Sequence, residues 1–314
     1  MNSLMTVNIK RYGITDKIIH TVCTSPPEEV FDFMEDFLVN EHGYSLVDSC
    51  IEEGTFYYAA FAPNDIYAYE DEVCLVAHLD TIGTYDADLR VVQSILEEEE
   101  GCLMHNGGGY FDDRAGVLGI IALVNDDCHP YIILTGEEEV GCVGAIKLVH
   151  DYPTIDLLFG DENLIQCLIE LDRQGVLEVV FYDLVYPEFE KIFTRAFDKK
   201  QGSFTDIAVL GPSWEIAAAN ISVGYYCEHS PQEFFLIEDF CLNINKIYDI
   251  ICEFHGYNKE DRWEYKGLNT RCVFLTNKPK YSNVIRYTPG TKTTTVYEEE
   301  EDLPNEAHSV YPDV

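Results

Sequence analysis

Long apolar runs are absent from this sequence of 314 residues. A helix that crosses a membrane needs about 18 consecutive apolar residues, and no stretch of the chain reaches that length. Residues 1–11 also lack the apolar segment that is typical of a signal peptide. We therefore expect a protein that has no membrane partner and stays in the cytoplasm.

Basic residues are scarce. The chain has 20 lysines and arginines against 57 acidic residues, which gives a formal net charge of −37. A surface this negative repels phosphate backbones, so we expect no nucleic-acid partner. The charge alone does not separate a solubilising surface from carboxylates that are grouped to hold cations. The spacing of the acids has to decide between these two interpretations.

Paired cysteines are also missing. The 11 cysteines are odd in number and scattered, and none of them forms a Cys-x-x-Cys pair. This pattern excludes the disulfide framework of a small secreted protein. Several cysteines, such as Cys74, Cys167 and Cys241, stand within apolar runs. We interpret the cysteines as reduced and mostly buried.

The remaining sequence alternates between short apolar runs and segments of helical periodicity. Residues 73–77 are apolar throughout, which is typical of a strand that is buried on both faces. The predicted strands are 44–47, 55–61, 73–77, 131–134, 155–159, 166–171, 176–181 and 215–219, and the predicted helices follow Ser25 and cover 115–124, 142–150, 187–197 and 234–254. Strands that alternate with helices predict an α/β fold, a three-layer sandwich with a mostly parallel central sheet flanked by helices.

The pattern changes after about residue 255. Residues 259–292 hold eight of the 20 bases with little hydrophobic periodicity, and residues 298–302 form an acidic run. We expect one catalytic domain at residues 1–254, and a C-terminal extension or tail at 255–314 that is partly disordered. Residues 89–105 are expected to form a hairpin or an excursion.

Acidic and histidine side chains follow several of the predicted strands. His78-Leu79-Asp80 comes directly after residues 73–77, and alternate residues of an extended segment point to the same side. Asp112-Asp113 opens a helix after the glycines at 107–109. Each motif also has an ordinary interpretation: a surface histidine beside a turn, and acids that cap a helix.

Glu137-Glu138-Glu139 ends the strand at 131–134, and Glu170-Leu171-Asp172 ends the strand at 166–171. Adjacent acids cost free energy unless a cation or a shared proton offsets them. A solvated loop is the alternative, and we prefer it for the acidic run at 97–100, which has no histidine nearby. His229 follows the last predicted strand. Because carboxyl ends of parallel strands meet at one edge of a sheet, the recurrence indicates a metal site there.

These motifs, taken in order, resemble the co-catalytic zinc exopeptidases, a superfamily that includes leucyl and glutamyl aminopeptidases and related deacylases. The order is His-x-Asp at 78–80, Asp-Asp before Ala-Gly at 112–116, Glu-Glu-Val-Gly at 138–141 with Gly-Ala at 144–145, a strand-end acid, and a late histidine. The resemblance covers roughly residues 26–252. It implies a zinc exopeptidase-like fold with no lid insertion.

The resemblance also implies roles for individual residues. The ligands of two divalent metal ions, most suitably zinc, would be His78, Asp112, Glu139, Asp172 and His229. Asp112 would bridge the ions through a cis Asp112–Asp113 peptide, Asp80 would lie behind His78, and Glu138 would be the general base. Glu170 is a rival for Asp172 because both lie on one strand face. Tyr225 or Tyr226 would donate to the tetrahedral intermediate, and Asp206 would lie on a substrate-facing loop.

The implied activity is hydrolysis of a peptide bond by a metal-activated water, with release of the N-terminal residue. A deacylase acting on N-acyl amino acids or small amides is the alternative, because both reactions attack a carbonyl group. Glu137, Glu228 and Asp206 favour recognition of a free amine, whereas Arg114 and Arg173 would suit a carboxylate. A non-catalytic binding protein is less consistent with the presence of Glu138, and calcium is less consistent with histidine ligands. The expected partner is a peptide or small amide, and a homo-oligomer stays open.

Overall fold

The computed structural model divides the chain into two units, Met1–Lys266 and Gly267–Val314. It describes residues 9–64, 73–82, 102–104, 111–160, 165–182, 187–202 and 204–253, and three short strands of the second unit. Those strands, β12 (Val273–Phe274), β13 (Asn283–Arg286) and β14 (Thr295–Glu298), pair in antiparallel fashion. The acidic run at 97–100 and the glycines at 107–109 lie outside the described residues.

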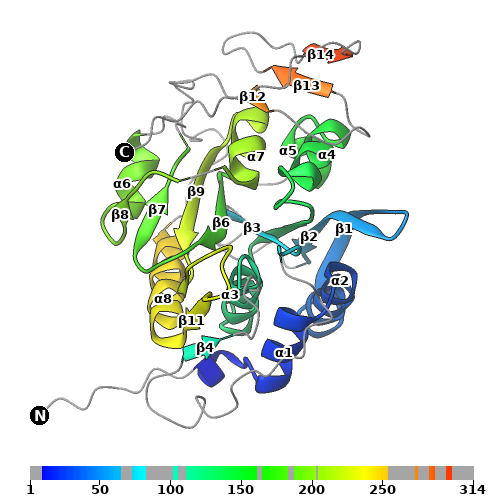
Figure 1. Cartoon of the computed structure of the whole chain (residues 1–314). Coiled ribbons are helices and arrows are strands. Elements are labelled where there is room, and N and C mark those ends of the chain that lie inside the picture. Colours follow the sequence, from blue (N-terminus) through cyan, green and yellow to red (C-terminus); the bar gives the residue numbers. More distant parts are fainter. Residues whose placement is uncertain are drawn as a thin grey trace, which may run out of the picture. The chain divides into compact units, whose positions relative to one another are not determined.

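A sheet of eight strands forms the centre of the first unit (Figure 1). In spatial order the strands are β1 (Tyr44–Glu52), β2 (Thr55–Pro63), β5 (Tyr131–Thr135), β3 (Val73–His78), β6 (Cys167–Arg173), β9 (Ala217–Ser222), β7 (Glu178–Val180) and β8 (Asp198–Lys199). The four central strands β5, β3, β6 and β9 run parallel. Antiparallel pairings join β1 to β2, β2 to β5, and β7 to β9.

The parallel centre follows from the composition of its strands. Every residue of β3, β5 and β9 is buried. Strands with apolar side chains on both faces are stable only where helices cover both faces of the sheet. The sequence of these strands therefore requires a layer of helices on each side.

Helices supply those two layers. They are α1 (Asp16–Thr24), α2 (Pro27–Glu35), α3 (Arg114–Asn125), α4 (Val143–Asp151), α5 (Ile155–Phe159), α6 (Pro187–Phe193), α7 (Asp206–Trp214) and α8 (Ile237–Glu253), with short turns of other helix types at η1 (Ile9–Tyr12) and η2 (Asp36–Glu41). Figure 1 shows α3 and α8 on one side of the sheet, and α4 and α7 on the other. The predicted three-layer α/β sandwich with a mostly parallel sheet is confirmed. No helix in the described part of the chain is both long and apolar enough to cross a membrane.

Two of the predicted elements differ in type from the structure, and the helices α1 and α7 were not predicted. Residues 155–159 were expected as a strand, but they form the short helix α5. The side chain of Thr154 caps this helix by accepting from the backbone N–H of Leu157 at 3.3 Å. A run of five residues, four of them apolar, carries too little periodicity to separate a strand from a helix turn. The helix expected at 234–254 begins only at Ile237, because residues 234–236 pair as a strand.

A small second sheet lies within the same unit. It consists of β10 (Tyr225–Tyr226), β11 (Phe234–Leu236) and β4 (Cys102–Met104), which pair in antiparallel fashion. β4 is the only described part of the excursion expected at 89–105. The loop between β10 and β11 carries His229, so this sheet determines where that histidine can lie.

Helix α4 packs so closely on the sheet that a glycine is needed at their contact. A Cβ atom at Gly144 would lie 2.1 Å from the carbonyl oxygen of Tyr57 and 2.4 Å from that of Gly136. We predict that Gly144→Ala lowers the free energy of unfolding by about 1–3 kcal/mol, because backbone atoms have to move. Urea denaturation measures the change.

Gly119→Ala is the matched control within a helix. Its Cβ atom would lie 3.0 Å from Cδ1 of Leu171 and 3.1 Å from Cδ1 of Ile244, which are the ends of mobile side chains. The better helix propensity of alanine, about 1 kcal/mol, offsets part of that cost. Equal losses of stability in the two variants would contradict the prediction.

Candidate metal centre

The side chains predicted to bind metal meet at the carboxyl ends of β3, β5 and β6. In the parallel register His78 pairs with Thr135, so the segments that follow β3 and β5 leave the sheet side by side. The backbone N–H of Leu79 donates to the carbonyl of Thr135 at 2.7 Å and continues this pairing past the end of β3. Consequently the motifs at residues 78–80 and 137–139 come together at one edge.

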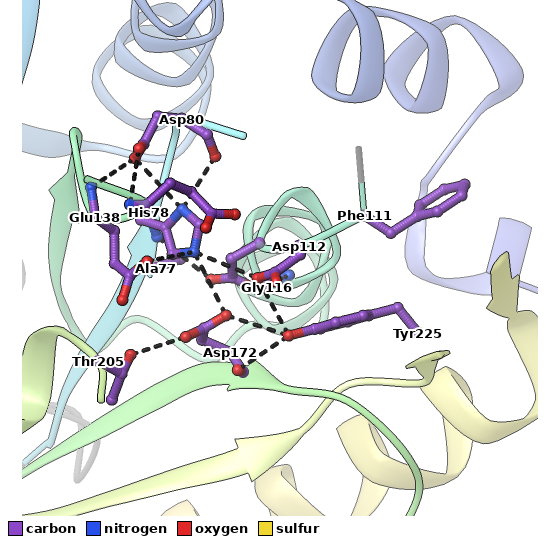
Figure 2. A network of polar contacts seen from close by, with 12 residues as sticks. Ala77, His78, Asp80, Phe111, Asp112, Gly116, Glu138, Asp172, Thr205 and Tyr225 are labelled. Atoms are coloured by element: carbon purple, nitrogen blue, oxygen red, sulfur yellow. Dashed lines mark hydrogen bonds and ion pairs between the residues drawn. The ribbon is translucent and has the colours of Figure 1, made fainter. Parts of the chain in front are cut away.

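The first group of side chains consists of His78, Asp112 and Asp172 (Figure 2). Nε2 of His78 lies 3.4 Å from Oδ1 of Asp112 and 3.5 Å from Oδ1 of Asp172. One ligand atom from each residue lies within 4.8 Å of the others. An imidazole nitrogen and two carboxylate oxygens thus point to one place.

The second group consists of Asp112, Glu139 and His229. Nε2 of His229 lies 3.0 Å from Oδ2 of Asp112 and 3.0 Å from Oε2 of Glu139. Asp112 therefore directs one carboxylate oxygen to each group. This is the arrangement expected of a carboxylate that bridges two ions. The Asp112–Asp113 peptide is cis, as the resemblance implied.

Asp80 holds both motifs of this edge together. Nδ1 of His78 lies 3.0 Å from the backbone oxygen of Asp80 and 3.4 Å from its Oδ1. The two carboxylate oxygens of Asp80 accept from the backbone N–H groups of Glu138 at 3.0 Å and Glu139 at 3.1 Å. A partner on Nδ1 leaves Nε2 of His78 facing the group, as in many metal-binding histidines.

Glu138 lies beside the first group without being part of it. Its Oε2 is 3.8 Å from Nε2 of His78, and the residue lines the pocket next to Asp112 and Asp172. Its neighbours in the acidic run differ from it: Glu139 joins the second group, and Glu137 has a backbone in the left-handed region, with φ of 57°. The position of Glu138 is that of a carboxyl group next to a metal centre rather than of a ligand.

The residues of the two groups fit a pair of divalent ions. Nε2 of His78 and Oε1 of Glu139 are buried and form no hydrogen bond. Buried polar atoms rarely remain without a partner, so such atoms indicate a missing ligand. Imidazole nitrogens and carboxylate oxygens are donors that zinc accepts, whereas calcium prefers oxygen alone.

The pKa values of the carboxyl groups reflect how crowded this edge is. Burial, reinforced by Asp112, raises the pKa of Glu139 to about 8 and that of Asp172 to about 7. Burial also raises the pKa of Glu138 well above its ordinary value, although His78 opposes it and Asp172 adds to it. For Asp112 burial acts upward, but the hydrogen bond with His229 and the nearby imidazole of His78 outweigh it, so its pKa is lowered.

The pKa values of both histidines are raised, whereas burial alone would lower them. A hydrogen bond with Asp112 raises the pKa of His229 to about 9, against the effect of burial. Burial lowers the pKa of His78, but Asp172 and Asp112 more than offset this, and the net value is well above the ordinary one. Protons thus occupy this edge where cations would otherwise neutralise the carboxylates.

The other predicted site residues fall into two classes. The hydroxyl of Tyr225 lies 3.2 Å from Oδ1 of Asp112 and 3.3 Å from Oδ1 of Asp172, so it contacts the first group directly. The hydroxyl of Tyr226 instead donates to Asp239, and its predicted contact with a reaction intermediate finds no support in this position.

Asp206 and Glu170 differ from expectation. Asp206 is the first residue of α7, fully buried and hydrogen-bonded with Thr135, so the predicted substrate-facing loop is wrong. Its place was misjudged because α7 was not foreseen. Glu170 is buried behind the pocket and belongs to neither group, so the geometry favours its rival Asp172 as a ligand.

Two residues that the sequence reasoning left out hold the Asp112 segment. Asp113 accepts from the backbone N–H of His78 at 3.3 Å and from that of Gly116 at 2.9 Å. Glu233 accepts from the backbone N–H of Asp112 at 3.0 Å. The position of Asp113 next to Asp112 in the sequence could have indicated its role. Nothing in the sequence indicates the role of Glu233, because it lies 121 residues from Asp112.

A pocket with an empty volume of about 420 Å³ opens beside the two groups. Its wall consists of Asp112, Glu138, Asp172, Arg173, Gln174, Tyr182, Phe204, Asn220, Tyr225, Glu228 and His229. Arg173 donates two hydrogen bonds to Oε2 of Glu178, at 3.1 and 2.8 Å. The other arginine considered for substrate binding, Arg114, is buried and donates to backbone carbonyls of Val22 and Ser25, so it cannot reach this pocket.

Comparison with known proteins bears on the fold. The sequence matches no protein-family model and no curated protein. Among solved structures, a tripeptidase from Staphylococcus aureus subsp. aureus Mu50 matches with a TM-score of 0.55 and 12% identity over 80% of this chain and 99% of that one. Aminopeptidase PepT from Bacillus cereus ATCC 10987 gives 0.54 and 13% over 80% and 100%.

A glutaminyl cyclase from Tannerella forsythia matches with a TM-score of 0.52 and 12% identity, over 82% of this chain and 100% of that one. These likenesses confirm that the chain has the zinc exopeptidase-like fold expected from its motifs. They also link the fold to proteins of different named activities, so the fold does not decide the reaction.

Metal ions and protons compete for this centre, so the stability that zinc adds should depend on pH. The raised pKa values of Asp172 and Glu139, about 7 and about 8, mean that without metal the folded state binds more protons than the unfolded state above about pH 4. The free energy of unfolding of the metal-free protein therefore falls as the pH rises to about 8. His229, with a pKa of about 9, acts in the same direction.

We predict that the increase in Tm on adding zinc grows between about pH 5 and about pH 8. Thermal melts followed by circular dichroism, with zinc or with a chelator at each pH, measure it. The lowered pKa of Asp112 acts only below this range, where its effect has the opposite sign. If zinc raised the Tm by the same amount at about pH 5 and at about pH 8, the prediction would be contradicted.

Proposed function

We propose that this chain is a metal-dependent hydrolase that cleaves peptide bonds and releases the N-terminal residue. The observation that carries the proposal is the pair of ligand groups that share Asp112, with the carboxyl group of Glu138 beside them. Two groups with one common carboxylate suit two ions about 3.5–4 Å apart. An isolated surface cluster of acids would have no reason for a histidine in each half, one of which, His78, is fully buried.

Zinc is the ion that the donor set suits best. Three carboxylates among the five ligands neutralise most of the charge of two divalent ions, and the two imidazoles disfavour calcium. When bound, the ions would polarise the carbonyl group of the substrate and make a water molecule more acidic.

Glu138 would take the proton of that water and pass it to the leaving amine. Its carboxyl group lies within the pocket wall and outside both ligand groups, so it is free to exchange protons without disturbing a ligand. Asp80 holds the backbone N–H of Glu138 at 3.0 Å and limits the movement of this residue. Tyr225, whose hydroxyl lies near two ligand carboxylates, would keep them in place while the charge at the centre changes.

A substrate with a free amino group fits the pocket better than one with a carboxylate. Arg173 is the one arginine among the described residues of the pocket wall, and Glu178 already neutralises it. Glu228 also lines the pocket, and burial followed by Asp112 raises its pKa. Hydrolysis of N-acyl amino acids remains the second candidate function, because Arg173 would meet the carboxylate of such a substrate.

Cytoplasmic location is part of the proposal. Cys74, Cys142 and Cys241 are buried thiols that form no disulfide, which suits a reducing compartment. A homo-oligomer stays a prediction from the sequence.

Glu138→Gln tests the general base. We predict that the variant keeps both metal equivalents and loses at least about 100-fold in kcat, because the amide cannot take a proton. Metal content by mass spectrometry and steady-state kinetics measure the two effects. Glu137→Gln is the control: Glu137 was a candidate for amine recognition, but it is not among the described residues that line the pocket, so removal of this adjacent acid should leave kcat near the native value. Full activity of Glu138→Gln would remove this residue from the role.

A panel of substrates separates the two candidate reactions. The zinc-loaded protein is expected to release the first residue of unblocked peptides and aminoacyl amides, and to act much more slowly on the same compounds with an acetylated N-terminus. Product analysis by mass spectrometry measures both. Cleavage of N-acyl amino acids alone would favour the deacylase, and no cleavage of any amide with two zinc ions bound would defeat the proposal.

A further inference from the structure

A fully buried carboxyl group holds the backbone at the centre of the metal site. Oε1 of Glu233 accepts from the backbone N–H of Phe111 at 3.1 Å and from that of Asp112 at 3.0 Å. The side chain is 0% exposed. Two N–H groups that precede a helix would otherwise have to find partners of their own, so this contact determines the course of the backbone at Asp112.

Other contacts join the same two segments. The rings of Phe111 and Phe235 stack with their centroids 5.4 Å apart and an interplanar angle of 15°. Phe235 pairs with Tyr225 across β10 and β11, and the hydroxyl of Tyr225 reaches Oδ1 of Asp112 at 3.2 Å. Glu233, Phe235 and Tyr225 thus attach the segment that contains Asp112 to β10, β11 and the residue before β11.

Glu233 also ends the loop that carries His229. Its backbone N–H donates to the carbonyl of Ser230 at 3.1 Å, and the hydroxyl of Ser230 donates to the carbonyl of Cys227 at 2.7 Å. His229 itself has a left-handed backbone with φ of 56°. His78 stands at the end of a buried strand, whereas His229 stands on the loop between β10 and β11.

We infer that Glu233 is a positioning residue for the second metal ion, the one that Asp112, Glu139 and His229 would hold. One carboxyl group joins the backbone of Asp112 to the end of the loop of His229, so it determines the distance between these two ligands. The inference rests on the proposed two-metal function and adds to it a residue that contacts neither ion.

The effect should be selective for the second ion. Two of the three residues in the first group, His78 and Asp172, belong to β3 and β6, whose register holds them without help from Glu233. In the second group, Glu139 is held by Asp80 through its backbone N–H, but Asp112 and His229 depend on the junction at Glu233. Loss of that junction therefore loosens two ligands of one ion and one ligand of the other.

Two substitutions separate the hydrogen bonds from the rest of the side chain. Glu233→Gln keeps an oxygen that can accept from both N–H groups, and Glu233→Met keeps the length and volume without that acceptor. The metal-free variants are titrated with zinc by calorimetry in the presence of a competing chelator. We expect two equivalents with native affinity for Glu233→Gln. For Glu233→Met we expect the second equivalent to bind about 10–100-fold more weakly, with the first changed much less.

Asn243→Leu is the matched control. Asn243 is also 0% exposed. Its Oδ1 accepts from the backbone N–H of Leu177 at 2.9 Å and its Nδ2 donates to the carbonyl of Gly175 at 3.3 Å, and neither partner belongs to a ligand group. This variant loses a buried acceptor of the same kind and should bind both equivalents as the native chain does. The same weakening in Asn243→Leu would show that general loosening is responsible and would overturn the inference.

Native affinity for both equivalents in Glu233→Met would also overturn it, as would equal weakening of both. If Glu233→Met does not fold, Glu233→Asp takes its place, since its carboxyl group is one methylene short of the two N–H groups. Native second-site affinity in that variant would count against the inference in the same way. Failure of the unaltered chain to bind two equivalents would instead defeat the proposed function, and the inference with it.

Discussion

Repulsion among buried carboxyl groups is the constraint on which this end of the sheet depends. Asp112, Glu139 and Asp172 converge on two histidines, and Glu138 and Asp80 lie directly beside them. Removing like charges from water at such distances costs several kcal/mol unless protons or cations neutralise them. The raised pKa values of Glu139 and Asp172 express that cost in protons. At neutral or alkaline pH, bound divalent ions would neutralise these carboxylates in place of protons.

Two different structural devices bring these groups together. The parallel register of β3, β5 and β6 places His78, the acidic run at 137–139 and Asp172 at one edge of the sheet. The apolar packing of the buried sheet offsets the repulsion among these side chains. Asp112 and His229 come from segments outside the sheet. Hydrogen bonds to Asp113 and Glu233 and the pairing of β10 with β11 hold them in place. The strand-borne half of the centre thus rests on apolar packing, and the loop-borne half on a few buried polar contacts.

This division explains what the sequence could predict. Apolar strands that end in acids or histidines reveal both their fold and their chemistry, so the sheet and the place of His78, Glu139 and Asp172 at its edge were foreseen. Asp112 and His229 lie outside the sheet, and only the order of the motifs pointed to them. Glu233 was missed because its partners lie more than 120 residues away and nothing local marks it.

Other errors have the same cause. Residues 155–159 were too short for their periodicity to be read, and α7 was not foreseen, which misplaced Asp206. Tyr226 neighbours Tyr225, which reaches the centre, but adjacent residues of a strand face opposite ways, and the hydroxyl of Tyr226 meets Asp239 instead. Local pattern predicts what one element does, whereas contacts between loops depend on tertiary structure.

The fold itself leaves the reaction open, since it is shared by proteins named as a tripeptidase, an aminopeptidase and a glutaminyl cyclase. The choice must therefore come from side chains in the pocket wall. A substrate carboxylate would have to compete with Glu178 for Arg173, which already donates two hydrogen bonds to Oε2 of Glu178 at 3.1 and 2.8 Å. A substrate ammonium group would instead enter a wall that carries Glu228 and the outer edges of the ligand carboxylates, where a positive charge lowers the local repulsion. Because the same repulsion shapes the metal centre, an amino group is the substrate feature that this site stabilises best.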